Sequence, residues 1–122
     1  MNRPKRPVRL ILTGQAKEEY ELLRKVVEEQ KKKGATNSEE IQLLKSISNK
    51  VELLKLNPVY GQSVPKDLIP NTLDVDNLFR VELTGYWRML YTLKTNQIEI
   101  VNFVLYIVDH KSYDRLFGYK FR

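Results

Sequence analysis

The sequence predicts an α+β domain in which a small, mostly antiparallel, twisted sheet carries two N-terminal helices on one face. Residues 15–54 contain two successive apolar stripes at helical spacing, and residues 78–108 contain three apolar, β-prone runs joined by tight turns. A short alternating run at residues 8–12 adds a strand before the helices, so the predicted order is β-α-α-β-β-β. The 122 residues suit a single domain. Within it, we expect residues 1–7 to form a flexible basic leader.

Composition excludes several classes of protein. With 42% apolar and 30% charged residues, the chain is typical of a globular domain and not of a disordered one. The longest apolar run, residues 103–108, is too short to span a bilayer, and no signal peptide is visible, which favours a cytoplasmic protein without membrane contact. The lack of cysteine excludes disulfides and thiolate chemistry, and a single histidine argues against a histidine-built metal site. We therefore expect neither a metal nor a cofactor.

The net charge of +6 is concentrated at the two ends of the chain. Residues 1–10 contain four basic side chains and no acid, and residues 78–122 contain seven basic side chains against four acidic ones. Such a surface suits a polyanion such as RNA or DNA, or an acidic protein partner. A solubilising lysine-rich surface explains the same excess equally well.

The two predicted helices form an antiparallel pair. The first covers residues 15–33, and the second begins with a capping box formed by Asn37 and Glu40 and ends before Pro58. Each helix has one apolar stripe, so we expect each to pack against the sheet.

The second half of the chain supplies the sheet. Residues 58–77 contain three prolines and no period, which predicts an ordered loop. Strands follow at residues 79–83, 87–93 and 98–108, the last of them apolar on both faces and therefore central. Residues 109–119 then form an exit loop with room for one helical turn. We assign Val64, Leu68, Ile69 and Leu73 of the loop, together with Trp87, Tyr91 and Phe103, to the core.

The turn at residues 84–86 decides which strand side chains share a face. If it is a three-residue turn, Glu82 and Arg88 lie directly opposite each other and Arg80 shares their face. A two-residue turn would send Arg88 to the other face. In the first case two guanidiniums stand on the open face of the sheet, and four side chains follow at its edge: His110, Lys111, Tyr113 and Arg115.

This group contains what RNA cleavage without a metal requires. The ribose 2′-OH attacks the adjacent phosphorus, so a protein must move protons and stabilise the charged phosphate. Arg80 and Arg88 suit the charge, because a guanidinium is planar and always protonated, and His110 suits the proton transfers. The late aromatic side chains are of the kind that stack on bases: Tyr113, Phe117 and Tyr119.

A purely structural explanation also fits each residue. Arg80 and Arg88 can pair with Glu82 across the hairpin. His110 can cap a loop carbonyl, and Tyr113 and Phe117, which are four residues apart, can fix the tail to the core.

The chain resembles the RelE/ParE superfamily of toxins from bacterial and archaeal toxin–antitoxin pairs. The resemblance rests on LFRVELTGYWRMLYTL, the apolar strand after it and DHKSYDRLF, with NPVYGQSVPKDLIP similar to the loop that precedes the sheet in the family. It covers essentially the whole chain and implies a RelE-like fold. It also implies a toxin that cuts messenger RNA on the ribosome, inhibits translation and is blocked by a small acidic antitoxin wrapped around it.

The resemblance also implies roles for particular residues. Arg80 and Arg88 match the basic residues of the two hairpin strands, and His110 or Lys111 falls where the family places a catalytic group or a phosphate-binding cation. The predicted RNA contacts are Tyr113, Arg115, Phe117 and Tyr119.

The chain departs from the family pattern at acidic positions. Glu82 stands where ribonuclease members often carry a second basic residue, and Asp109 and Asp114 add negative charge to the tail. Two alternatives therefore stay open beside the ribonuclease. One is a ParE-type inhibitor of DNA gyrase that cuts no RNA, and the other is a member that only binds protein or RNA.

Overall fold

A computed structural model describes residues 6–118 of the chain. Most of the predicted leader and Tyr119 lie outside these residues. The α+β architecture and the predicted order of the main elements are confirmed. In chain order the elements are β1 (Val8–Leu12), α1 (Gly14–Lys32), α2 (Glu39–Leu56), β2 (Gln62–Ser63), the 3₁₀ turn η1 (Lys66–Leu68), β3 (Phe79–Glu82), the 3₁₀ turn η2 (Thr84–Tyr86), β4 (Arg88–Thr95), β5 (Ile100–Val108) and α3 (His110–Phe117).

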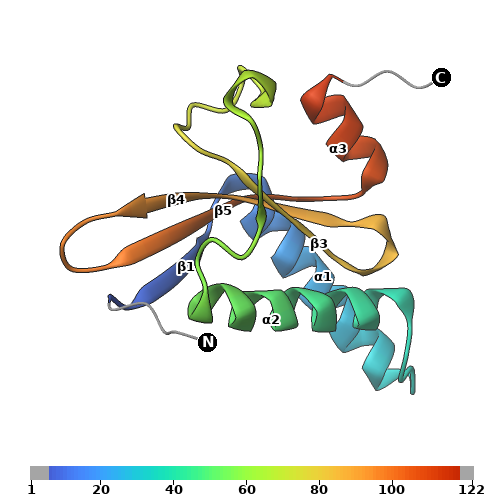
Figure 1. The fold of residues 1–122 in the computed structure, drawn as a ribbon. Coiled ribbons are helices and arrows are strands. Elements are labelled where there is room, and N and C mark those ends of the chain that lie inside the picture. The colour runs from blue at the N-terminus through green and yellow to red at the C-terminus, as the bar shows by residue number, and fades with distance from the viewer. Residues whose placement is uncertain (1–5, 119–122) are drawn as a thin grey trace.

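The five strands form one sheet in the order β1-β5-β4-β3-β2. Only β1 runs parallel to its neighbour β5; the other pairs are antiparallel. Strand β5 therefore lies inside the sheet, as its apolar character on both faces predicts. In Figure 1, α1 and α2 lie on one side of the sheet, and α3 and the long loop lie on the other. No helix within residues 6–118 is long and apolar enough to cross a membrane.

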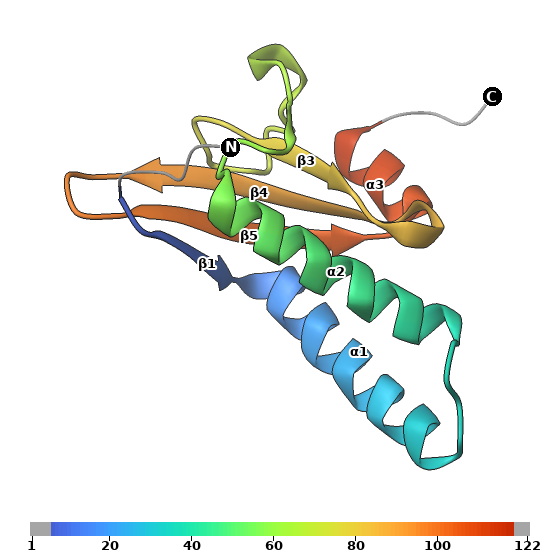
Figure 2. The ribbon, with the colours of Figure 1, turned by 60° about the horizontal axis from the view of Figure 1, so that its bottom comes forward.

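The larger core lies between the sheet and the two N-terminal helices. The two helices lie side by side on this face of the sheet, as Figure 2 shows from a second direction. Their buried positions repeat at helical spacing, and the strands contribute alternate residues. The buried members are Ala16, Leu23, Val27, Ile41, Leu43, Ile47, Leu54, Val81, Leu83, Met89, Tyr91, Val104 and Ile107. Phe103, which we expected in the core, is only half-buried.

The opposite face of the sheet is not open, contrary to expectation. Leu90 and Val108 of the strands, and Leu78 directly before β3, lie on this face and are almost fully buried. Apolar strand residues need a cover, and the loop at residues 58–77 together with α3 supplies one. Leu68 is an exception, because its side chain is 48% exposed and contributes nothing to this second core. The packing members are Val64, Ile69, Leu73, Val75, Leu105, Tyr106, Tyr113, Leu116 and Phe117.

A β-bulge in β5 changes the direction of its last residues. Leu90 pairs with Tyr106 but Tyr91 pairs with Val104, so Leu105 is an extra residue. Before the bulge Val104 faces the helices, and after it Val108 faces α3. The bulge thus orients the end of β5 that leads directly into α3.

Two helix starts differ from the predicted ones. The cap of α2 is Ser38, whose hydroxyl accepts from the backbone N–H of Ile41, so the predicted capping box at Asn37 is one residue too early. The tail forms a helix of eight residues instead of an exit loop with a single turn. Its N-cap is Asp109, which accepts from the N–H of Ser112, and Gly118 ends it in the left-handed region.

Candidate functional site

The predicted register of the arginine hairpin is the three-residue one. The turn comprises residues 84–86, with Gly85 at a positive φ of 68°, and Glu82 lies directly opposite Arg88. Arg80 lies on the same face as Arg88, and both side chains reach towards α3. The two-residue alternative is therefore wrong, and the two guanidiniums do gather on one face.

Tyr113 lies between the two arginines and organises them. Its hydroxyl accepts a 3.2 Å hydrogen bond from Nη1 of Arg80, and the guanidinium carbon of Arg88 lies 4.7 Å from the centre of its ring. Phe117 stacks on the same ring, with the ring centres 4.5 Å apart. Because Tyr113 is only 4% exposed, its ring is covered by these neighbours and offers no free face to a base. In this arrangement it positions the arginines.

The two guanidiniums have different surroundings. Arg80 also donates to the side-chain oxygen of Gln62 on β2. The side chain of Arg88 is only 15% exposed, and the facing carboxylate of Glu82 is 4.0 Å from its Nη2 and itself 71% exposed. The Nε of Arg88 is buried and has no hydrogen-bond partner within residues 6–118. The positive charge of Arg88 is therefore only weakly balanced by protein groups. This favours the binding of an additional anion beside the exposed side of its guanidinium.

His110 is the first residue of α3 and contacts both Arg88 and Asp114. Its Nδ1 is 3.4 Å from Nη1 of Arg88, and its Nε2 is 3.4 Å from Oδ2 of Asp114. A guanidinium only donates, so Nδ1 must be the acceptor, and a neutral His110 carries its proton on Nε2, the nitrogen that faces the carboxylate of Asp114. This tautomer leaves the basic nitrogen beside Arg88.

The N-cap of α3 is Asp109. The backbone N–H of Ser112 holds the pKa of Asp109 below its usual range, against a smaller opposing effect of burial. This cap fixes the start of α3 and therefore the position of His110.

The remaining predicted residues lie along α3. Lys111 and Arg115 are exposed, and Nη2 of Arg115 donates to the hydroxyl of Ser112 at 3.2 Å. Phe117 is half-buried in the second core, so the expectation that Tyr113 and Phe117 fix the tail is confirmed. No cluster of acidic or histidine side chains within residues 6–118 is arranged to hold a metal ion.

The structure adds two residues that the sequence did not single out for this site. Gln62 belongs to a two-residue strand inside the long loop, and no pattern marks it. Asp114 does carry a signal, since it lies four residues after His110, but that spacing has meaning only once the tail is known to be helical.

Comparison with known proteins supports the fold and nothing finer. No protein-family model matches the sequence, and no curated protein is similar enough to count as a relative. Among solved structures, the chain is similar to a YoeB/ParE toxin from Agrobacterium tumefaciens, with a TM-score of 0.54 and 15% sequence identity. The match covers 84% of this chain and 98% of that one. The predicted RelE-like fold is thus confirmed.

Proposed function

We propose that this chain is the toxin of a type II toxin–antitoxin pair and acts in the cytoplasm as a metal-independent endoribonuclease on ribosome-bound mRNA. The observation that carries the proposal is the convergence of Arg80 and Arg88 on the buried ring of Tyr113, with His110 beside Arg88. The RelE-like fold, shared with a YoeB/ParE toxin, supports the assignment to toxins.

The arrangement suits attack of the ribose 2′-OH on the adjacent phosphorus. Arg88 turns outward to the phosphate and uncovers Nδ1 of His110, which takes the proton of the 2′-OH as the P–O bond forms. The guanidiniums of Arg80 and Arg88 stabilise the additional negative charge of the pentacovalent phosphate. The bond to the 5′-oxygen then breaks, and that oxygen takes a proton from the protonated His110 or from Lys111.

The proposed antitoxin is a small acidic protein that forms a heteromeric complex with the toxin. Its acidic residues would occupy the edge of Arg88, where the present neighbour is a distant and exposed carboxylate. An antitoxin bound there covers the same guanidiniums that meet RNA.

One observation favours the two alternatives to the ribonuclease. These are a ParE-type inhibitor of DNA gyrase and a member that only binds RNA or protein. Glu82 faces Arg88 across the hairpin and adds negative charge where the ribonuclease needs cations. The similar solved structure is named only as a YoeB/ParE toxin, and its name does not separate these functions.

Expression in a host from a tight promoter, with pulse labelling of protein and DNA synthesis, separates these functions. The ribonuclease is supported if protein synthesis stops first with the wild type and continues with an Arg88→Ala, His110→Ala double variant. If DNA synthesis stops first, the ParE-type function is correct. Normal growth with soluble wild-type protein would leave only the binding member. With purified protein we expect each single variant to cleave RNA well over roughly tenfold more slowly.

A further inference from the structure

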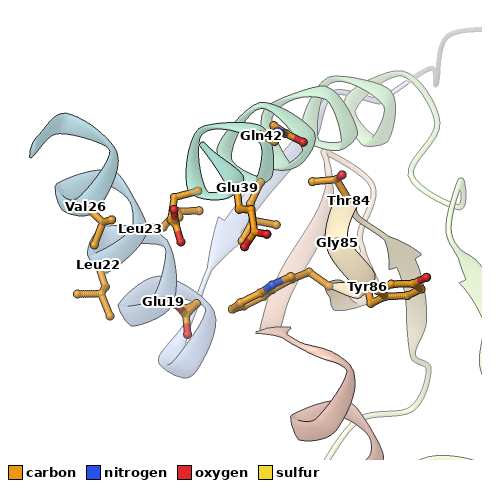
Figure 3. Close-up of a pocket in the computed structure, with 12 residues that line it drawn as sticks. Glu19, Leu22, Leu23, Val26, Glu39, Gln42, Thr84, Gly85 and Tyr86 are labelled. Carbon is orange, nitrogen blue, oxygen red and sulfur yellow. The ribbon is translucent and has the colours of Figure 1, made fainter. Parts of the chain in front are cut away.

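A groove of about 530 Å³ lies between α1, α2 and the turn η2. Figure 3 shows Leu22, Leu23 and Val26 of α1 on one side of it and the turn with Thr84 on the other. It opens on the helix side of the sheet, whereas the arginine face lies on the side of α3. The apolar lining side chains are Leu22, Leu23, Val26, Leu43 and Trp87.

Part of this apolar lining is exposed without a cover. The side chain of Leu22 is 58% exposed and that of Val26 is 37% exposed, one helical turn apart on α1. A single exposed apolar side chain is ordinary. Leu22 and Val26, however, lie one turn apart beside a groove that Trp87 also lines, so together they form an exposed apolar surface.

The charged groups of the groove are all acidic. Glu19, Glu39 and Glu40 line it, and no lysine or arginine does. Within residues 6–118 none of the three forms an ion pair, although Glu40 accepts a hydrogen bond from Gln30. Burial raises the pKa of Glu19, and the negative charge of Asp109 raises it further. An apolar groove bordered by acidic side chains alone attracts a cation.

The turn beside the groove holds a strained aromatic residue. Tyr86 has a φ of 63°, a region that tyrosine rarely adopts, and its side chain is 79% exposed. In Figure 3 its ring points outward from the margin of the groove. The turn itself is fixed, because the N–H of Thr84 donates to the hydroxyl of Ser46 on α2. Strain at a rigid turn that displays a large aromatic side chain is typical of binding surfaces.

We propose that this groove binds an apolar segment of a partner protein that carries lysine or arginine beside its apolar residues. The apolar side chains would cover Leu22 and Val26, and the cations would meet the three carboxylates. An acidic segment would place like charges together. The inference goes beyond the proposed function, because the groove and the arginine face lie on opposite sides of the sheet and can be occupied separately.

A random peptide library displayed on phage, selected on the immobilised full chain, tests the proposal without knowledge of the natural partner. We expect the enriched peptides to combine apolar residues with lysine or arginine. Their synthetic forms should bind the wild type and lose at least roughly tenfold in affinity for a Leu22→Glu, Val26→Glu variant, because each carboxylate would be buried without a partner where apolar side chains of the peptide pack. Ile98→Glu is the matched control, because Ile98 is 78% exposed at the far turn between β4 and β5.

Two further variants test charge and strain. Glu39→Lys should weaken binding and make the loss of affinity with salt shallower, since it reverses one of the attracting charges that salt screens. Tyr86→Gly should raise the melting temperature while it weakens binding, because glycine adopts the positive φ without strain. Enrichment of acidic peptides, equal binding to the Leu22→Glu, Val26→Glu variant, or no enrichment at all would each overturn the proposal. None of these outcomes depends on whether the chain cleaves RNA.

Discussion

Arg88 lies with its guanidinium carbon 4.7 Å above the ring of Tyr113, and the hydroxyl of the same ring accepts a hydrogen bond from Arg80. One buried tyrosine therefore positions two cations that the strands bring to the same face. The face of the ring holds Arg88, and its hydroxyl holds Arg80. These two contacts can be removed separately.

Tyr113→Phe should release Arg80 and leave Arg88 in place. The variant keeps the ring, its stacking on Phe117 and its contact with Arg88, and loses a hydrogen bond worth about 1 kcal/mol. We expect cleavage of RNA to fall several-fold while the melting temperature falls by only about 4 °C. Tyr113→Ala should instead lower the free energy of unfolding by about 3–5 kcal/mol, as the loss of a buried aromatic ring does. Equal cleavage by wild type and Tyr113→Phe would show that the bond to Arg80 has no catalytic role.

Asp114 should determine the tautomer of His110. The chain has one histidine, so its imidazole ¹⁵N signals can be assigned without ambiguity. At a pH where the ring is neutral, we expect the wild type to carry the proton on Nε2. Asp114→Ala removes the acceptor and should let the Nδ1-protonated form appear, whereas Asp114→Asn keeps an acceptor oxygen and should retain the original tautomer. Identical spectra for wild type and Asp114→Ala would contradict this role.

The Asp109 cap of α3 should make the stability of the protein depend on pH. Because the folded protein lowers the pKa of Asp109 below its ordinary value of 3.8, the stabilisation is complete above that value and is lost as the pH falls through the folded pKa. Asp109→Ala should cost about 1 kcal/mol at neutral pH and should flatten the acid limb of the stability profile. Denaturant unfolding of both proteins between neutral and acidic pH measures this. An unchanged acid limb would mean that other carboxylates control it.

The topology could be predicted because it rests on local periodicity, such as the apolar stripes of residues 15–54 that predict helices. The arginine register stayed open between two turn lengths, and the three-residue turn of the structure places Arg80 and Arg88 on one face. The bulge at Leu105 could not be predicted, since β5 is apolar on both faces and has no alternation for an extra residue to interrupt. The helical tail was missed because only three of its side chains pack on the sheet. The link between His110 and Asp114 depends on that helix and was missed with it.

Gly61→Ala should destabilise the long loop. A Cβ at this position would lie 3.0 Å from the backbone oxygen of Arg80 and 3.0 Å from the ring of Tyr91. The hydroxyl of Tyr91 also accepts from the N–H of Gly61 and donates to the carbonyl of Pro58, so the loop has little room to move. We expect a loss of about 1–3 kcal/mol in the free energy of unfolding, the usual cost of overpacking. Ser63→Ala, two residues further along on an exposed position, is the control and should be close to neutral.

Glu82→Gln should strengthen RNA binding, because it removes the one carboxylate that faces Arg88 across the hairpin. Charges 4.0 Å apart at an exposed position attract each other by only about 1 kcal/mol, so the expected gain in affinity is a few-fold. Titration of a labelled single-stranded RNA at several salt concentrations measures it. Glu99→Gln is the matched control, because Glu99 lies at the opposite end of the sheet. There its Oε2 forms a 2.9 Å ion pair with Nη2 of Arg9. If Glu82→Gln binds RNA more tightly but no longer cleaves it, Glu82 takes part in the proton transfers, and the departure from the family pattern is a catalytic feature of this chain.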